Sequence, residues 1–304
     1  MPSLRARLAR TVLRWQLRGW AEGDIQQQRA RQAALSRLTP LPKSVRYRSV
    51  DVDGVAAEWI EAPEVADGVL LYLHGGAYCL GSVATHRELI ARLIDGTRYR
   101  ALALEYRRAP EHPFPVALED TLTAYRWLLA QGHAPEEIVL AGDSAGGGLA
   151  VAALVVLREA GTPLPAAALC FSPWFDLTLS GASIQTQAAA DPLLDAVSLR
   201  RYARAYAGDA PLVHPLISPL HAELHGLSPL LIQVGTAEIL LDDAVRLADA
   251  ARKVGVGVTL QTWEGLFHVF QMLPFLPETD EALAEVASFL AACRRRGRER
   301  TGSS

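Results

Sequence analysis

The stretch from residue 138 to residue 159 constrains the fold of this chain more than any other. An apolar, β-branched run at 138–141 leads into a turn of small residues, and an alanine- and leucine-rich run follows at 149–159. This order predicts a strand, a tight turn and a helix. A Gly-x-Ser-x-Gly motif centred on Ser144 lies at the turn, as in a nucleophile elbow, where glycines let strand and helix approach closely. The alternative is a glycine-rich turn with an incidental serine, and the rest of the chain decides between the two.

Apolar runs separated by helical patterns continue along the chain and predict an α/β fold. The expected strands are 45–52, 56–62, 68–73, 101–106, 138–141, 167–171, 230–234 and 258–263. The expected helices between and after them are 86–94, 116–131, 145–159, 242–254 and 278–295. Strands that are apolar throughout and separated by helices imply a mostly parallel, eight-stranded sheet with helices on both faces. An antiparallel hairpin around Asp53-Gly54 opens it, and ligands of such sheets bind at the carboxyl ends of the strands.

Two segments do not follow this alternation of strands and helices. Helical patterns fall within residues 2–37, before a boundary at Pro40-Leu41-Pro42. Between residues 173 and 230 there is no clear strand, only helical pieces near 198–207. An insertion of that length over a site is expected to form a lid or cap, with which the N-terminal helices pack.

The first helical segment is rich in arginine and slightly resembles a mitochondrial transit peptide, without the apolar core of a signal peptide. We favour an amphipathic helix that belongs to the fold, because four apolar residues recur at helical spacing. These are Leu4, Leu8, Val12 and Trp15.

Composition excludes several classes of function. The 304 residues are half hydrophobic and carry a formal net charge of −3, which gives no reason to expect a nucleic acid or an anionic membrane as partner. No apolar run approaches the ~20 residues that a membrane span needs. Cys79, Cys170 and Cys293 lack the spacing of a metal site, so we expect no metal, reduced thiols and a cytoplasmic protein.

A serine nucleophile needs a base, and the base needs a carboxylate that orients it. His268 follows the expected strand 258–263, and Glu238 follows the strand 230–234, which gives the order serine, acid, histidine. Asp242 and Asp243 are alternative acids, but they look like the start of the following helix, where carboxylates are favoured. We therefore predict Ser144, Glu238 and His268 as the catalytic residues.

A second small-residue loop follows the expected strand 68–73. It begins His74-Gly75-Gly76-Ala77, and so carries little side-chain bulk. Its N–H groups, with that of Ala145 at the start of the helix, are expected to bind the oxyanion of a tetrahedral intermediate. Among Gly75, Gly76 and Ala77 the last two are favoured as donors, and we expect His74 mainly to brace the loop.

Together these motifs resemble the hormone-sensitive lipase family of α/β-hydrolases, the bacterial family IV esterases. The motifs that carry the resemblance are His74–Tyr78, Tyr106–Pro115, Gly142–Gly147, Ser172–Leu177 and Phe267–Phe270. The resemblance implies an α/β-hydrolase fold, a cap built from the N-terminal helices and the insertion, and no cofactor. It maps Ser144 and His268 onto nucleophile and base, and Gly75–Ala77 with Ala145 onto the oxyanion hole.

The sequence departs from the family pattern at two places. Ala77 stands where many members have a third glycine, although its backbone N–H is still present. Glu238-Ile239-Leu240 stands where many members have Asp-Pro-Leu. The segment Tyr106–Pro115 is expected to be a structural brace.

The resulting hypothesis is a carboxylic-ester hydrolase for short- to medium-chain esters, acting through an acyl-serine intermediate. Hydrolysis of a lactone, an acetylated natural product or an amide by the same residues is the alternative, and a non-catalytic ligand receptor on this scaffold is a further one. A homodimer through the edge strand 258–263 is also expected. The expected division is 1–42 N-terminal cap helices, 43–177 first part of the core, 178–215 cap insertion, 216–296 second part of the core, and 297–304 disordered tail.

Overall fold

The computed structural model describes residues 1–16, 23–37, 39–42, 44–63 and 68–301. The strands are β1 (Arg46–Val52), β2 (Val55–Glu61), β3 (Val69–Leu73), β4 (Arg100–Leu104), β5 (Ile138–Asp143), β6 (Ala167–Phe171), β7 (Leu230–Gly235) and β8 (Val258–Trp263). The α-helices are α1 (Leu4–Gln16), α2 (Ile25–Ser36), α3 (Val83–Thr97), α4 (Val116–Ala130), α5 (Ala145–Glu159), α6 (Ser183–Thr186), α7 (Ala196–Ala207), α8 (Leu241–Lys253) and α9 (Pro277–Thr301).

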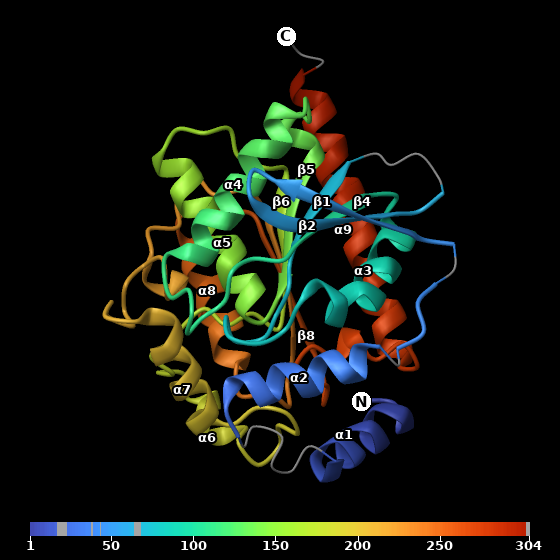
Figure 1. The fold of residues 1–304 in the computed structure, drawn as a ribbon, viewed down its shortest axis with the longest axis vertical. Coiled ribbons are helices and arrows are strands. Elements are labelled where there is room, and N and C mark those ends of the chain that lie inside the picture. The colour runs from blue at the N-terminus through green and yellow to red at the C-terminus, as the bar shows by residue number, and fades with distance from the viewer. Residues whose placement is uncertain (17–22, 38, 43, 64–67, 302–304) are drawn as a thin grey trace.

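All eight strands form one sheet in the order β1-β2-β4-β3-β5-β6-β7-β8. The pairs β1–β2 and β2–β4 are antiparallel and the rest are parallel. Helices α3 and α9 cover one face, and α4, α5 and α8 cover the other (Figure 1). The predicted α/β-hydrolase sheet is confirmed, with β8 at its edge.

The expected strands and helices agree closely with the structure. The hairpin turn has Asp53 at φ 50° and Gly54 at φ 88°, as the two central residues of a type I′ turn require. Helix α3 starts at Val83, earlier than expected, because Ser82 and Thr85 form a capping box. At the C-terminus, α9 continues to Thr301.

Helices from two distant parts of the chain lie at the same end of the molecule. Figure 1 shows α1 and α2 beside α6 and α7, all beyond the end of the sheet that lies opposite the C-terminus. The apolar stripe of α1 does not face the fold as expected. Leu8 and Trp15 are exposed, and the helix instead buries Ala6 and Ala9, because small residues let it pack closely on the core.

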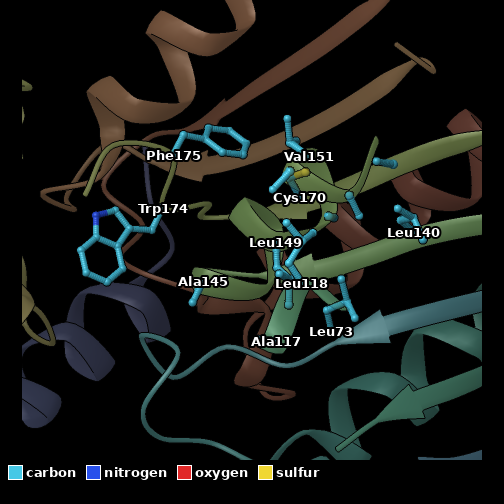
Figure 2. Close-up of a cluster of buried hydrophobic side chains, with 14 of the residues drawn as sticks. Leu73, Ala117, Leu118, Leu140, Ala145, Leu149, Val151, Cys170, Trp174 and Phe175 are labelled. Atoms are coloured by element: carbon cyan, nitrogen blue, oxygen red, sulfur yellow. The ribbon is translucent and has the colours of Figure 1, made fainter. Parts of the chain in front are cut away.

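The core on the α5 side surrounds the strand-turn-helix segment. Leu73, Leu140 and Cys170 come from three neighbouring strands and face Leu149 and Val151 of α5 (Figure 2). All five side chains are at most 1% exposed. The segment at 138–159 is therefore fixed by packing on both sides, which gives the turn between β5 and α5 a rigid support.

Two glycines permit the close approach of α5 to the sheet. A Cβ atom at Gly146 would overlap the carbonyl oxygen of Leu73 in β3. A Cβ atom at Gly142 would lie 2.5 Å from the carbonyl oxygen of Gly146. Only glycine fits at either position without moving the backbone.

We expect Gly146→Ala to lower the free energy of unfolding by about 3 kcal/mol, because the overlapping atoms belong to backbone that cannot yield. Urea denaturation of the variant and the wild type measures the difference. Gly96→Ala is the matched control: Gly96 lies in α3 with open space around it, and alanine there should stabilise by about 0.5–1 kcal/mol. Equal stability of the two variants would contradict the close-approach argument.

Candidate active site

Ser144 occupies the turn between β5 and α5 in a conformation that L-residues rarely adopt. Its φ is 52° and its ψ is −118°, as expected for the serine of a strained elbow. Its N–H donates to the Phe171 carbonyl at 2.8 Å, and its own carbonyl accepts from the Trp174 N–H at 3.0 Å. Neighbouring backbone at the end of β6 therefore holds this strained conformation in place.

Glu238 and His268 meet beyond the ends of β7 and β8. Nδ1 of His268 lies 2.8 Å from Oε2 of Glu238, and both side chains are buried. A carboxylate oxygen can only accept a hydrogen bond, so Nδ1 donates and Nε2 of the neutral ring is the free acceptor. This is the arrangement of an acid that orients a general base.

Ser172 holds Glu238 in position. Its hydroxyl donates to Oε1 of Glu238 at 2.7 Å and accepts from the Val269 N–H at 2.9 Å. The Gly235 N–H donates to the same Oε1 at 2.7 Å. Ser172 directly follows Phe171, whose carbonyl binds the Ser144 N–H. One short segment at the end of β6 therefore contacts Ser144, Glu238 and the residue after His268.

The surroundings of His268 raise its pKa above the ordinary value. Burial acts to lower the pKa, but the hydrogen bond to Glu238, the charge of Glu238 and the charge of Asp191 outweigh it. Asp191 comes from the insertion before α7, and its Oδ2 accepts from the Ile239 N–H at 2.9 Å. A residue of the insertion thus stabilises the acid loop and the protonated histidine together.

The two alternative acids have other partners. Asp242 accepts from the Ser183 N–H at 2.9 Å. Asp243 accepts from the N–H groups of Phe175 and Asp176 at 2.9 and 2.7 Å. Both lie in the first turn of α8, as predicted, and they fix the segment that follows β6. Of the three carboxylates considered, Glu238 is the one that His268 contacts.

The loop after β3 folds sharply over the site. Gly76, Ala77 and Tyr78 have φ values of 121°, 52° and 60°. Within the described residues, the N–H groups of Gly76, Ala77 and Ala145 have no hydrogen-bond acceptor. The expectation for Gly75 needs correction, because its N–H donates to Oδ1 of Asp143 at 3.0 Å. That amide is already used inside the protein and leaves the set of candidate oxyanion donors.

Asp143 and His86 form a buried ion pair beneath this loop. Nε2 of His86 lies 3.3 Å from Oδ2 of Asp143, and the Tyr72 hydroxyl donates to Oδ1 at 2.8 Å. Burial acts to raise the Asp143 pKa, but the charge and hydrogen bond of His86 lower it overall. For His86, burial acts to lower the pKa and Asp143 raises it overall. The contact with His86 fixes the carboxylate that holds Gly75.

His74 is a structural residue, as expected. Its ring stacks on Tyr106 with centroids 4.2 Å apart, and Nδ1 lies 2.8 Å from the Gly75 carbonyl oxygen. Burial, and next the charge of His86, lower its pKa to about 3. The Tyr106 hydroxyl donates to the His74 carbonyl at 2.7 Å. Tyr106 therefore braces the loop from the segment 106–115, in agreement with the expected role of that segment.

Helix α2 is tied to the same loop from the N-terminal side. The Arg29 guanidinium donates to the carbonyls of Cys79 and Ala109, both at 2.7 Å, and pairs with Glu111 at 2.9 Å. Gln32 accepts from the Gly81 N–H at 2.9 Å. The α2 helix thus stabilises the backbone directly after the candidate oxyanion donors.

Sequence reasoning missed four of these residues as parts of the site: His86, Asp143, Ser172 and Asp191. Asp143 and Ser172 lie inside recognised motifs at strand ends, which is a usable signal. His86 and Asp191 carry no such signal, since each contacts the site from a different segment. Within the part of the chain that the structure describes, no cluster of three or more His, Cys, Asp or Glu side chains fits a metal ion. No described helix is long and apolar enough to span a membrane.

Comparison with known proteins identifies the family of this chain. A family model described as the alpha/beta hydrolase fold matches residues 70–272. An acetyl-hydrolase of Streptomyces hygroscopicus is 52% identical over 242 residues, 79% of this chain and 81% of that protein. An esterase of Acinetobacter venetianus is 37% identical over 257 residues, 84% of this chain and 85% of that protein.

Solved structures extend the similarity to the whole fold. The crystal structure of an esterase from the bacterial hormone-sensitive lipase family has a TM-score of 0.89 and 44% identity, and covers 92% of this chain and 96% of that one. EstE5, soaked with p-nitrophenyl butyrate, has a TM-score of 0.92 and 39% identity, covering 96% and 99%. The fold and strand-end loops define an α/β-hydrolase. The chain belongs to this family, and within it to the bacterial hormone-sensitive lipase group.

We expect Glu238→Gln to lower kcat by about 10⁴-fold, since an amide no longer fixes the histidine tautomer or stabilises its charged form. Asp242→Asn is the matched control on the neighbouring helix, and should change kcat only a few-fold while lowering stability. Steady-state rates with p-nitrophenyl butyrate measure both. A larger loss in Asp242→Asn than in Glu238→Gln would reassign the acid.

Proposed function

We propose that this protein is a carboxylic-ester hydrolase that acts through an acyl-serine intermediate on Ser144. Two observations carry the proposal: the buried 2.8 Å contact between His268 and Glu238, and the strained strand-to-helix turn that Ser144 occupies. A non-catalytic receptor on the same scaffold would have no need to keep this costly buried pair. The family and the names of the relatives support the same class of reaction.

In the proposed mechanism His268 Nε2 takes the proton of the Ser144 hydroxyl as its oxygen attacks the ester carbon. The N–H groups of Gly76, Ala77 and Ala145 stabilise the oxyanion, and each critical donor contributes about 3–4 kcal/mol. The imidazolium gives its proton to the departing alcohol, which leaves the acyl group on Ser144. His268 then activates a water molecule, whose attack releases the acid and returns the proton to the serine.

We propose short- to medium-chain esters as substrates, with acetyl esters first among them. A relative at 52% identity is named an acetyl-hydrolase. We propose that the cap consists of residues 1–42 and 178–215, and the catalytic core of the remaining residues up to 296. Helix α7 of this cap packs on the loop after β3 through Tyr206, whose ring stacks on that of Tyr78 with centroids 3.7 Å apart. A cap that packs this closely favours small acyl groups. Lactones and amides would use the same residues, and a substrate panel distinguishes them.

Two further proposals concern assembly and location. Among the residues that the structure describes, no strand pairs with the outer side of the edge strand β8 at 258–263, which favours a homodimer through β8. A cytoplasmic location is supported by Cys79 and Cys170, which are buried thiols. Burial raises the pKa of both to about 12, so neither is prone to form a disulfide.

A fluorophosphonate probe tests the nucleophile directly. We expect the wild-type chain to gain the mass of one phosphonyl group and to lose its activity toward p-nitrophenyl butyrate. Ser144→Ala should remain unlabelled, and its kcat should fall by about 10⁶-fold. Ser49→Ala, at an exposed position of β1, serves as the control serine and should still be labelled. Labelling of Ser144→Ala at an unchanged rate would refute the assignment.

The pH dependence of kcat/KM tests the base. His268 acts only when neutral, and its pKa is raised above 6.5. As pH falls, activity should therefore be lost with a midpoint above 6.5. In Glu238→Gln the main charge that raises this pKa is gone while burial remains, so the midpoint should move to lower pH. If the midpoint is the same in the variant and the wild type, the loss of activity at low pH is not caused by protonation of His268.

A further inference from the structure

Four large apolar residues of α1 are exposed on the surface of the protein. Among the described residues ten large apolar side chains are exposed, and five of them lie in the first 15 positions. Four of these form what we call the α1 stripe: Leu4, Leu8, Val12 and Trp15. Leu4, Leu8 and Trp15 expose 71%, 66% and 76% of their surfaces. Their spacing places them along one side of the helix, and exposed apolar surface of this extent marks an interaction surface.

The orientation of the α1 stripe is fixed by contacts on the opposite side of the helix. Ala6 and Ala9 pack with Phe267 and Phe270 in one buried cluster. The N–H and hydroxyl of Ser3 donate to the two carboxylate oxygens of Glu278 at 2.6 and 3.0 Å. The α1 stripe is therefore exposed on the other side of the helix, and α1 lies at the end of the molecule where α2, α6 and α7 also lie (Figure 1).

Positive charge flanks the stripe on both sides. The first acidic residue of the chain is Glu22, and five arginines precede it: Arg5, Arg7, Arg10, Arg14 and Arg18. At 100° per residue, Arg5 lies along one border of the stripe, and Arg7 and Arg14 lie toward the other. The whole chain carries a net charge of −3, so this positive charge is a local feature of the N-terminal segment. The near-neutral total conceals it.

We propose that the α1 stripe docks onto the surface of a lipid bilayer that contains anionic lipids. A helix with leucine and tryptophan on its outer face and arginines at the borders is suited to the boundary between headgroups and acyl chains. A second copy of this chain fits the surface less well, because two stripes placed face to face would bring their arginines together. Because the inner face of α1 packs on Phe267, next to His268, docking would hold this part of the protein close to a surface where apolar esters concentrate.

Co-sedimentation of the full chain with vesicles tests the proposal. We expect binding to vesicles of phosphatidylcholine mixed with phosphatidylglycerol, weaker binding to phosphatidylcholine alone, and a loss of the difference at high salt. The double variant Leu8→Ser/Trp15→Ser should bind the mixed vesicles at least about tenfold more weakly. Arg7→Gln should weaken binding about fivefold, and only to the anionic vesicles.

Matched controls separate docking from folding and from general stickiness. Val254→Ser removes an exposed apolar side chain, 46% exposed, at the end of α8, and should bind as the wild type does. Every variant should hydrolyse p-nitrophenyl acetate in solution at the wild-type rate. A blue shift of tryptophan emission on adding vesicles should occur in the wild type and be absent in Trp15→Phe.

Three outcomes would overturn the proposal. The first is that neither kind of vesicle binds the wild type, and the second is that the double variant binds as well as the wild type does. The third is a dimer in analytical ultracentrifugation that Leu8→Ser/Trp15→Ser abolishes, which would assign the stripe to a second copy. None of these outcomes bears on ester hydrolysis, which is measured independently with the soluble ester.

Discussion

The close approach of α5 to the sheet is the constraint on which the rest of the site depends. Glycine at positions 142 and 146 lets the first turn of α5 contact the backbone of β3. This contact places Ser144 at the carboxyl ends of the central strands, and the buried core shown in Figure 2 supports it from below. The loops after β3, β6, β7 and β8 begin at the same edge of the sheet as the turn that carries Ser144.

Two buried acid–histidine pairs lie at this edge of the sheet, and they have different roles. The Glu238–His268 pair lies on the side of β7 and β8 and leaves one ring nitrogen free to move a proton. The Asp143–His86 pair lies beneath the loop after β3, and all the hydrogen bonds of the Asp143 carboxylate are made inside the protein. The first pair is suited to chemistry, and the second holds a backbone amide and thereby shapes the loop that carries the candidate oxyanion donors.

Local sequence patterns were sufficient for much of this description and failed for identifiable reasons. The strands could be predicted because hydrophobic periodicity is a local property. The order Ser144, Glu238, His268 could be predicted because it is an order along the chain. The hydrogen bond that the Gly75 N–H donates could not be predicted, because its acceptor Asp143 lies on another strand. The helical period of α1 was also read correctly, but periodicity does not say which face is buried. Packing of Ala6 and Ala9 decided that, and it turned the apolar stripe outward.

The sequence by itself determined the mostly parallel sheet, the strained serine turn, and which strand ends carry functional residues. These depend on hydrophobic periodicity and on glycines that no other residue can replace, which are properties of neighbouring residues in the chain. Only the tertiary structure decided that Glu238, rather than Asp242 or Asp243, contacts His268, and that Ser172, His86 and Asp191 support the site. Such contacts join segments far apart in the chain, and their geometry is set by how strands and helices pack.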